Sequence, residues 1–253
     1  MTAFVVVGDR FALFAGHAPA LTVSRVIDEL GNGDGWFGKG SDPVVLAEGQ
    51  GVTEEDWGRI RGEIARRDLA DRFEIRQSPR GPLSGTEETH KHREENFLIA
   101  GLEKAGDHEF EASLRLHNDQ ELQLDHPGVH VQGMVILEAA RQMYIAVCER
   151  YYTVSRSAER QIHVLDRMES SFRNFLYPVE TRIRSAVVVG TNAYDLPTFD
   201  VRTEFRQAGL HIAVVRTTGT AMSRPVLDRK EARGAERAVR HTLRNLPLPA
   251  RAQ

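Results

Sequence analysis

The stretch LDHPGVHVQGMVILEAARQM, residues 124–143, determines how the rest of the chain is interpreted. It leads through Gly133 into a run that is apolar nearly all round, from Met134 to about Tyr151. In a globular protein such a helix must be covered on most of its sides. Glu138 and other polar side chains near its start make it a poor membrane span, because they are costly in lipid. The stretch therefore predicts a long buried helix.

Segments in which apolar and polar residues alternate lie on both sides of this helix. The pattern is clearest at residues 110–116 and has the period of two that is typical of a strand with one buried face. Further strands are predicted at residues 182–189, 199–205 and 210–217. The short connection through Ala208 and Gly209 predicts a hairpin between the last two. An antiparallel sheet wrapped around one buried helix is the hotdog fold, so the predicted fold class is α+β.

Turn-forming residues and charge divide the chain into four predicted parts. Residues 1–78 predict a small α+β domain of unknown role, in which Thr53 can cap a helix that runs to about residue 69, with Asp56 three residues later. Its other predicted elements are an amphipathic segment at residues 21–30 and strands at residues 3–7, 11–15, 43–48 and 72–76. The remaining parts are a linker at residues 79–88, the hotdog domain at residues 89–225 and a basic helix or tail at residues 226–253.

The composition excludes several classes of protein. The only cysteine, Cys148, lies in an apolar stretch, which excludes an intrachain disulfide or thiolate metal site. A formal net charge of -3 over 253 residues argues against a general nucleic-acid binder. The N-terminus lacks the basic region of a signal peptide, so the cytoplasm is the expected location and no membrane anchor is predicted. Because neither a dinucleotide fingerprint nor a close-spaced set of metal ligands is present, we predict no metal and no cofactor.

The start of the buried helix can supply several reactive groups. The backbone N–H groups of Gly133 and Met134 have no intrahelical partner, so they can bind a thioester carbonyl or the oxyanion derived from it. Glu138 lies about 7.5 Å along the helix axis from Gly133, at 1.5 Å per residue. Its apolar surroundings predict a raised pKa, which suits a general acid or base. Either His126 or His130, in the preceding loop, could move a second proton.

These candidates also have purely structural interpretations. Glu138 could simply pair with Arg141 at i+3, although burying a carboxylate on so apolar a helix is costly. His126 and His130 could be satisfied by the backbone. Asp125 could orient His126, cap it or form a turn.

Three further polar residues are weaker candidates for substrate binding. Arg141 and Gln142 could hold a polar acceptor, or they could be structural. His90, in the segment THKHREENFLI, could be a surface residue.

The segments THKHREENFLI and DHPGVHVQGMVILEAARQ together resemble the A-factor biosynthesis hotdog family. Its members carry a His-Lys pair near the start of a repeat and a DH-x-x-x-H-x-x-GM-x-x-x-EA-x-RQ segment at the helix. The helix start is also similar to that of the dehydratases of fatty-acid synthesis, in which a loop histidine and a helix glutamate share proton transfer. The resemblance implies a hotdog fold that handles acyl thioesters, with Glu138 and either His126 or His130 as catalytic residues.

Two features depart from the pattern of these families. Family members that make a butyrolactone signal precursor usually contain two hotdog repeats, whereas one is visible here, which implies a homodimer with sites at the subunit interface. The loop before the helix is shorter than in the dehydratases, so the spacing does not decide between His126 and His130.

Two classes of function follow from the resemblance. The first is an enzyme that acts on an acyl chain bound to an acyl carrier protein or coenzyme A. Within this class, transfer or condensation onto a small hydroxylated acceptor ranks above dehydration of a 3-hydroxyacyl thioester and thioester hydrolysis. The second class is a non-catalytic protein that binds an acyl thioester or a signal molecule.

The C-terminal part of the chain is distinctly basic. Residues 224–253 contain eight Arg or Lys residues and three Asp or Glu residues. Such a segment is consistent with a solvated helix, or with a docking surface for an acidic partner such as an acyl carrier protein.

Overall fold

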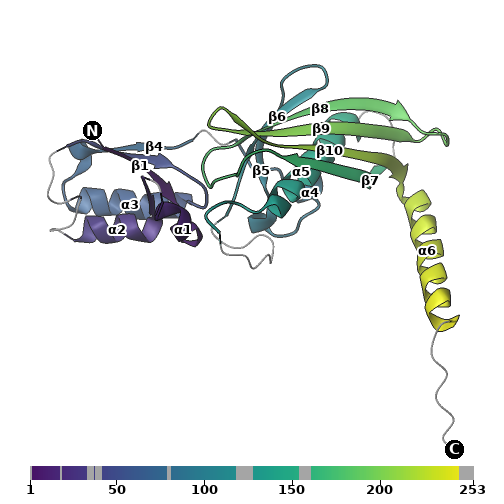
Figure 1. The fold of residues 1–253 in the computed structure, drawn as a ribbon, viewed down its shortest axis with the longest axis horizontal. Helices are drawn as coiled ribbons and strands as arrows, with labels where there is room; N and C mark the ends of the chain where they lie inside the picture. Colours follow the sequence, from purple (N-terminus) through teal and green to yellow (C-terminus); the bar gives the residue numbers. More distant parts are fainter. Residues whose placement is uncertain are drawn as a thin grey trace, which may run out of the picture.

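The computed structural model describes residues 2–17, 19–32, 37, 42–78, 81–117, 128–153 and 161–244. Two β-sheets organise these residues, one of four strands in the order β2-β1-β3-β4 and one of six in the order β5-β6-β8-β9-β10-β7. Figure 1 shows the two sheets side by side along the long axis of the molecule. Helix α6 extends from the end of the six-stranded sheet that is farther from the four-stranded sheet. Within the described ranges, no helix is both long and apolar enough to cross a membrane.

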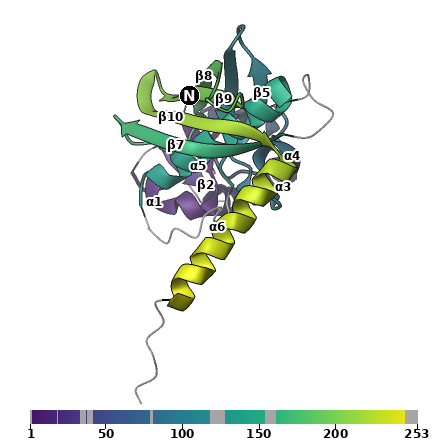
Figure 2. The same ribbon diagram turned by 90° about the vertical axis from the view of Figure 1, so that its right-hand side faces the viewer.

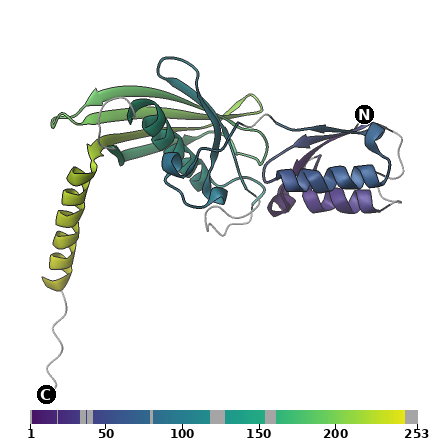
Figure 3. The same cartoon turned by 180° about the vertical axis from the view of Figure 1, so that it is seen from behind.

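The N-terminal sheet is entirely parallel. Its strands are β1 (Thr2–Val7), β2 (Ala20–Thr22), β3 (Val44–Glu48) and β4 (Phe73–Arg76). Parallel neighbours need a crossover connection, and α1 (Ala12–Ala15), α2 (Val23–Gly31) and α3 (Glu54–Arg66) supply it. Figure 3 shows α2 and α3 together on one face of this sheet. The apolar residues between them and the sheet, including Trp57 and Leu46, form a core of their own.

One local prediction in this region is confirmed and another is wrong. Thr53 caps α3 through a capping box, in which its hydroxyl accepts a hydrogen bond from the Asp56 amide and the Asp56 carboxylate accepts one from the Thr53 amide. Residues 11–15, predicted as a strand, instead belong to the 3-10 turn η1 (Asp9–Phe11) and helix α1. The crossover from β1 to the parallel β2 requires this reversal, and helical spacing brings Phe11 and Phe14 into one apolar cluster with Val129 and Val179 of the hotdog domain.

The C-terminal sheet is antiparallel throughout and wraps around one helix. Its strands are β5 (Ile99–Lys104), β6 (Glu109–Leu114), β7 (Gln161–Phe172), β8 (Arg182–Thr191), β9 (Pro197–Gln207) and β10 (Leu210–Ser223). The helix α5 (Gly133–Val147) continues as a π-helical segment, Cys148–Thr153, and lies across one face of the sheet (Figure 3). Ten of the fifteen α5 residues are buried. This is the predicted hotdog fold.

The predicted hairpin joins β9 to β10. Ala208 and Gly209 have φ values of 50° and 77°, as the two central residues of a type I′ turn require. Strands β5 and β7 were not predicted, and β7 is the outermost strand on its side of the sheet.

The described part of the predicted linker packs against the hotdog sheet. Leu83 pairs with Ala100 of β5, and the Ser84 amide donates to the Ile99 carbonyl at 3.1 Å. Gly81 approaches Gly101 so closely that an added Cβ would lie 2.5 Å from the Gly101 Cα, which requires glycine at this position. Helix α4 (Thr86–Thr89) then begins at once. The segment therefore brings residues 90–97 onto α5 in a fixed position.

Gln50 connects the two sheets. It follows β3 and is buried, and its side-chain oxygen accepts a hydrogen bond from the Leu116 amide at 2.9 Å. Its side-chain nitrogen donates to the carbonyl oxygens of Leu114 and Val179 at 3.0 and 3.3 Å. The Gln50 amide donates to the Pro178 carbonyl at 2.9 Å. One side chain thus satisfies polar backbone groups that the contact between the two sheets buries.

Replacing Gln50 with alanine is expected to lower the free energy of unfolding by about 2–3 kcal/mol, because buried backbone groups would lose their partners. Chemical denaturation measures this difference. Gln77→Ala changes an exposed glutamine and is the matched control, with an expected change within about 0.5 kcal/mol. Equal effects of the two substitutions would show that the contact at Gln50 contributes nothing specific to stability.

Candidate active site

Helix α5 positions the candidate site because its sequence leaves little freedom at its start. Its N-cap residue Gln132 has extended backbone angles, and Gly133 opens the helix. A Cβ on Gly133 would lie 3.2 Å from the Phe172 ring of β7, so glycine allows the helix to begin close to the sheet. Glu138 follows one and a half turns later, with a side chain that is 14% exposed.

Glu138 is surrounded by hydrogen-bond donors. Lys91 Nζ lies 2.9 Å from its Oε1. Arg141 binds both carboxylate oxygens, with Nε donating to Oε2 at 2.8 Å and Nη2 donating to Oε1 at 2.9 Å. Gln142 Nε2 donates to Oε1 at 3.0 Å. The carboxylate is therefore a largely buried anion with two cationic partners, one of them bidentate.

These contacts correct the prediction of a raised pKa at Glu138. Burial does raise the pKa, but the hydrogen bonds from Arg141 and Gln142, the charge of Arg141 and the hydrogen bond from Lys91 together hold it below its ordinary value of 4.5. The sequence prediction gave burial more weight than the donors, of which Arg141 and Gln142 lie on the same helix and Lys91 comes from another segment. Glu138 is consequently ionised at neutral pH.

Gln142 holds the segment that carries Lys91 against α5. Its side chain is fully buried, its oxygen accepts a hydrogen bond from the Leu98 amide at 2.8 Å, and its nitrogen donates to the Asn96 carbonyl at 2.7 Å. The nitrogen also reaches Glu138, as described above. Gln142 therefore fixes the position of the carboxylate relative to residues 96–98.

Arg141 and His90 extend this network along the helix. Arg141 Nη2 donates to the carbonyl of Thr89, the last residue of α4, at 3.1 Å. His90 follows with a left-handed backbone conformation, φ 55°, and its Nε2 lies 3.3 Å from Oε1 of Glu149. The adjacent residues His90 and Lys91 thus contact different carboxylates. Of the predicted candidates, Arg141 and Gln142 meet Glu138, whereas His90 meets Glu149.

The other predicted site residues lie nearer the start of α5 or outside the described chain. The His130 ring packs at a tilt against the Phe175 ring, with ring centroids 4.5 Å apart. Met134 is exposed in the first turn of the helix. Asp125 and His126 lie outside the described residues. Among the residues that the structure describes, no group of three His, Cys, Asp or Glu side chains is placed to hold a metal ion.

Lys91 is the site residue that sequence reasoning missed. It is 27% exposed and lies far from Glu138 in the sequence, so no helical spacing connects the two. A signal was nevertheless present, because Lys91 is the second residue of the His-Lys pair on which the family resemblance partly rests.

The contacts at Glu138 predict a specific pH dependence of stability. Because the folded pKa is lowered below 4.5, the stabilisation from these contacts is fully present above about pH 4.5 and is lost as the pH falls through the folded pKa. Glu138→Gln is expected to be less stable than wild type by about 1–3 kcal/mol at pH 7, with the difference shrinking in acid. Denaturation from pH 7 to pH 2 measures it, and Glu87→Gln, an exposed carboxylate on α4, is the control. A difference that stays constant down to pH 2 would contradict the lowered pKa.

Several solved structures are similar to part of the chain. A conserved protein from Pseudomonas aeruginosa is 16% identical, with 48% of this chain and 86% of that chain covered and a TM-score of 0.36. A thioesterase from Haemophilus influenzae is 12% identical, with 49% and 78% covered and a TM-score of 0.36. A variant thioesterase from Pseudomonas aeruginosa is 14% identical, with 49% and 81% covered and a TM-score of 0.35. No curated protein matches the chain.

A family model matches more of the chain and includes the described site. The model of the A-factor biosynthesis hotdog domain matches residues 86–223, which is more than half of the chain. The match begins at α4, includes Lys91 and Glu138, and ends with β10. The chain therefore belongs to the A-factor biosynthesis hotdog family.

Proposed function

We propose that this protein is an enzyme that transfers the acyl group of a carrier-bound or coenzyme A-bound thioester to the hydroxyl group of a small acceptor. The observation that carries the proposal is the ionised carboxylate of Glu138, one and a half turns inside α5, with Lys91 and Arg141 in contact with it. Membership of the A-factor biosynthesis hotdog family supports a substrate of the acyl-thioester class.

An ionised carboxylate suits the removal of a proton from an acceptor hydroxyl group. In the proposed step the acceptor oxygen forms a bond to the thioester carbonyl carbon, and the carbon–sulfur bond breaks. Glu138 accepts the hydroxyl proton, and the thiolate leaving group is finally protonated, with a loop histidine as the proposed proton carrier. Water in place of the acceptor would give thioester hydrolysis by the same step.

Lys91 and the first backbone N–H groups of α5 can assist this step. An acceptor hydroxyl that displaces Lys91 from Oε1 of Glu138 would remove a stabilising charge and so raise the pKa of the carboxylate. The first backbone N–H groups of α5, at Gly133 and Met134, are proposed to bind the thioester oxygen as negative charge develops on it.

Dehydration of a 3-hydroxyacyl thioester ranks second for a physical reason. That reaction needs a protonated acid to release the hydroxyl group as water, whereas the contacts of Glu138 lower its pKa and favour the ionised form. A loop histidine would have to supply the proton instead.

We further propose a homodimer in which a second copy completes the site. Strand β7 is the last strand of the hotdog sheet on its side, and alternate residues along its twelve-residue length direct their backbone groups to the outer edge. Such an edge is a template for pairing with another chain. Native mass spectrometry distinguishes a dimer of twice 28.4 kDa from a monomer.

Intact-protein mass spectrometry of carrier proteins loaded with 3-oxoacyl or 3-hydroxyacyl groups tests the reaction. Unloading that requires a hydroxylated acceptor, such as a triose phosphate, is the expected result, and Glu138→Gln is expected to slow it at least 100-fold. His126→Gln and His130→Gln, tested separately, identify the histidine that moves the second proton, and Glu87→Gln is the control. Loss of about 18 Da from the hydroxyacyl carrier would establish dehydration instead. Unchanged carriers together with retained binding would establish a binding protein.

Lys91 gives a second prediction about the same reaction. Lys91→Met removes a cation that lowers the pKa of Glu138, so the acidic limb of the pH profile of kcat/KM is expected to move to higher pH. Lys104→Met, on β5, changes a lysine that makes no ion pair within the described part of the chain and is the matched control. An unshifted profile in Lys91→Met would show that Lys91 does not set the ionisation of Glu138 in the free enzyme.

A further inference from the structure

Helix α6 (Arg224–Arg244) differs from every other long helix in having almost no cover. Its described side chains are exposed from Asp228 to His241, and Val239 is 58% exposed. Most of the stability of a protein helix comes from packing of one face against another element. Gly234 in its interior weakens it further. The helix therefore lacks, within one copy of the described chain, the surface that would stabilise it.

The two faces of α6 are chemically distinct. At 3.6 residues per turn, Arg229, Arg233, Arg237 and Arg240 fall within an arc of about 80°. Within the part of the chain that the structure describes, Arg229, Arg233 and Arg237 make no ion pair. A second stripe consists of the small or apolar residues Ala232, Ala235 and Val239. This combination is typical of a helix that packs against a partner with its apolar stripe and meets negative charge with its flank.

Charge complementarity favours an acidic partner for α6, and a second copy of the chain is one. Residues 224–253 contain eight basic and three acidic residues, which leaves 25 basic and 33 acidic residues in the rest of the chain. The rest of the chain therefore carries a net negative charge, which attracts the basic α6 over long range. Beyond Leu227, the described side chains of α6 are exposed and are not packed into the core of their own copy.

Helix α6 extends beyond the outer edge of β7, where the second copy is proposed to bind. Helix α6 begins directly after Ser223, which pairs with Gln161 at the start of β7. Figures 1 and 2 both show α6 running away from the body on the side where β7 is the last strand. If two β7 edges pair antiparallel, the Gln161 end of one copy lies beside the Phe172 end of the other.

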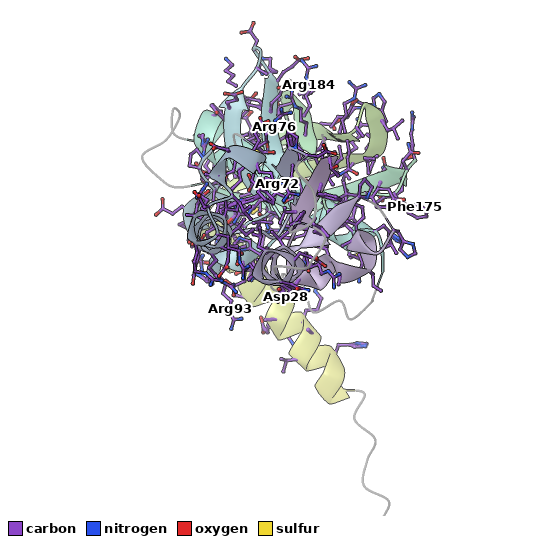
Figure 4. All side chains as sticks on the ribbon, turned by 90° about the vertical axis from the view of Figure 1, so that its left-hand side faces the viewer. Asp28, Arg72, Arg76, Arg93, Phe175 and Arg184 are labelled. Carbon is purple, nitrogen blue, oxygen red and sulfur yellow. The ribbon has the colours of Figure 1, made fainter. Side chains whose placement is uncertain are left out.

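The Phe172 end of β7 carries a group of exposed apolar side chains at the start of α5. Phe172, Phe175 and Met134 are 49%, 63% and 55% exposed, and Figure 4 shows Phe175 pointing away from the body. A Cβ on Gly133 would touch the Phe172 ring, so this apolar group and the N-terminus of α5 adjoin each other. An exposed group of this kind next to a candidate site marks a surface that a partner covers.

We propose that α6 is an arm that lies against a second copy of this chain, over the apolar group formed by Met134, Phe172 and Phe175. Its arginines then line the approach to Glu138 in that copy, where they attract the phosphate groups of a carrier or of coenzyme A. Each site in the dimer is built from the α5 of one copy and the α6 of the other. This inference rests on the homodimer proposed above.

Photo-cross-linking between differently labelled copies tests the arm. Ala235→Cys introduces an exposed thiol on α6 for a maleimide-linked photoprobe, while the native Cys148 is buried. Unlabelled variant protein is mixed and re-equilibrated with ¹⁵N-labelled wild type, so that links between copies are identified by mass. The expected result is a link to the ¹⁵N-labelled peptide that contains Met134 or Phe175. Tyr194→Cys, 84% exposed in the turn between β8 and β9, is the control and is expected to give no such link.

Native mass spectrometry of the same samples separates the possible failures. A dimer in which α6 links only within its own copy overturns the arm and leaves the homodimer intact. A monomer overturns both the arm and the homodimer. Links that form only after an acidic acyl carrier protein is added, and only to that protein, overturn the arm and assign α6 to carrier docking.

A charge-reversal variant provides an independent measurement. Arg233→Glu combined with Arg237→Glu is expected to raise the dimer dissociation constant about tenfold at low salt, with a smaller effect at high salt. Glu231→Lys, on a different face of α6, is the matched control. An unchanged dissociation constant in the double variant would contradict an electrostatic contact between α6 and the second copy.

Discussion

The neutralisation of one carboxylate on an apolar helix is the constraint on which the hotdog part of the structure depends. An unpaired Glu138 would be costly to bury, and its lone pairs are satisfied by Lys91, Arg141 and Gln142. Since Lys91 comes from the segment after α4, this segment must lie against α5 for Glu138 to be buried with both of its cationic partners. The same contacts that permit burial therefore also define the candidate site.

Gln142 makes this closure geometrically specific. A cation can approach a carboxylate from many directions, but the Gln142 amide has one oxygen and one nitrogen that must meet a donor and an acceptor at once. The Leu98 amide and the Asn96 carbonyl satisfy both. The position of Lys91 relative to α5 is consequently fixed by hydrogen bonds between Gln142 and the backbone and not by charge alone. These hydrogen bonds do not depend on the contact between Lys91 and Glu138.

Elements with a clear periodic pattern could be predicted from the sequence. The buried helix was predicted because its residues are apolar on nearly every side, and β9 and β10 because their residues alternate around a two-residue turn. Strand β7 escaped prediction because it is an edge strand, whose exposed face mixes Leu165 and Phe172 with charged residues. Strand β5 escaped because Gly101, at φ 64°, interrupts its pattern.

The site could be predicted only as far as local spacing reaches. The relation of Glu138 to Arg141 and Gln142 follows from one helix turn, whereas its contact with Lys91 depends on how two distant segments fold together. The wrong expectation for the pKa had a different origin. Helical spacing shows that Arg141 and Gln142 can reach Glu138, but whether their hydrogen bonds outweigh burial depends on distances that the sequence does not give.

The contact at Gln50 changes what the N-terminal parallel sheet can do. In open α/β sheets, ligands usually bind beyond the carboxyl ends of the strands, at the point where successive connections leave in opposite directions. Here β1 lies between β2 and β3, and Gln50, beyond β3, binds the backbone of Leu114 at the end of β6 and of Leu116 just after it. A small molecule that entered this position would have to compete with the hotdog sheet itself. Occupancy there and separation of the two sheets would then be thermodynamically linked, so the place where such folds ordinarily receive a ligand serves in this protein as a joint.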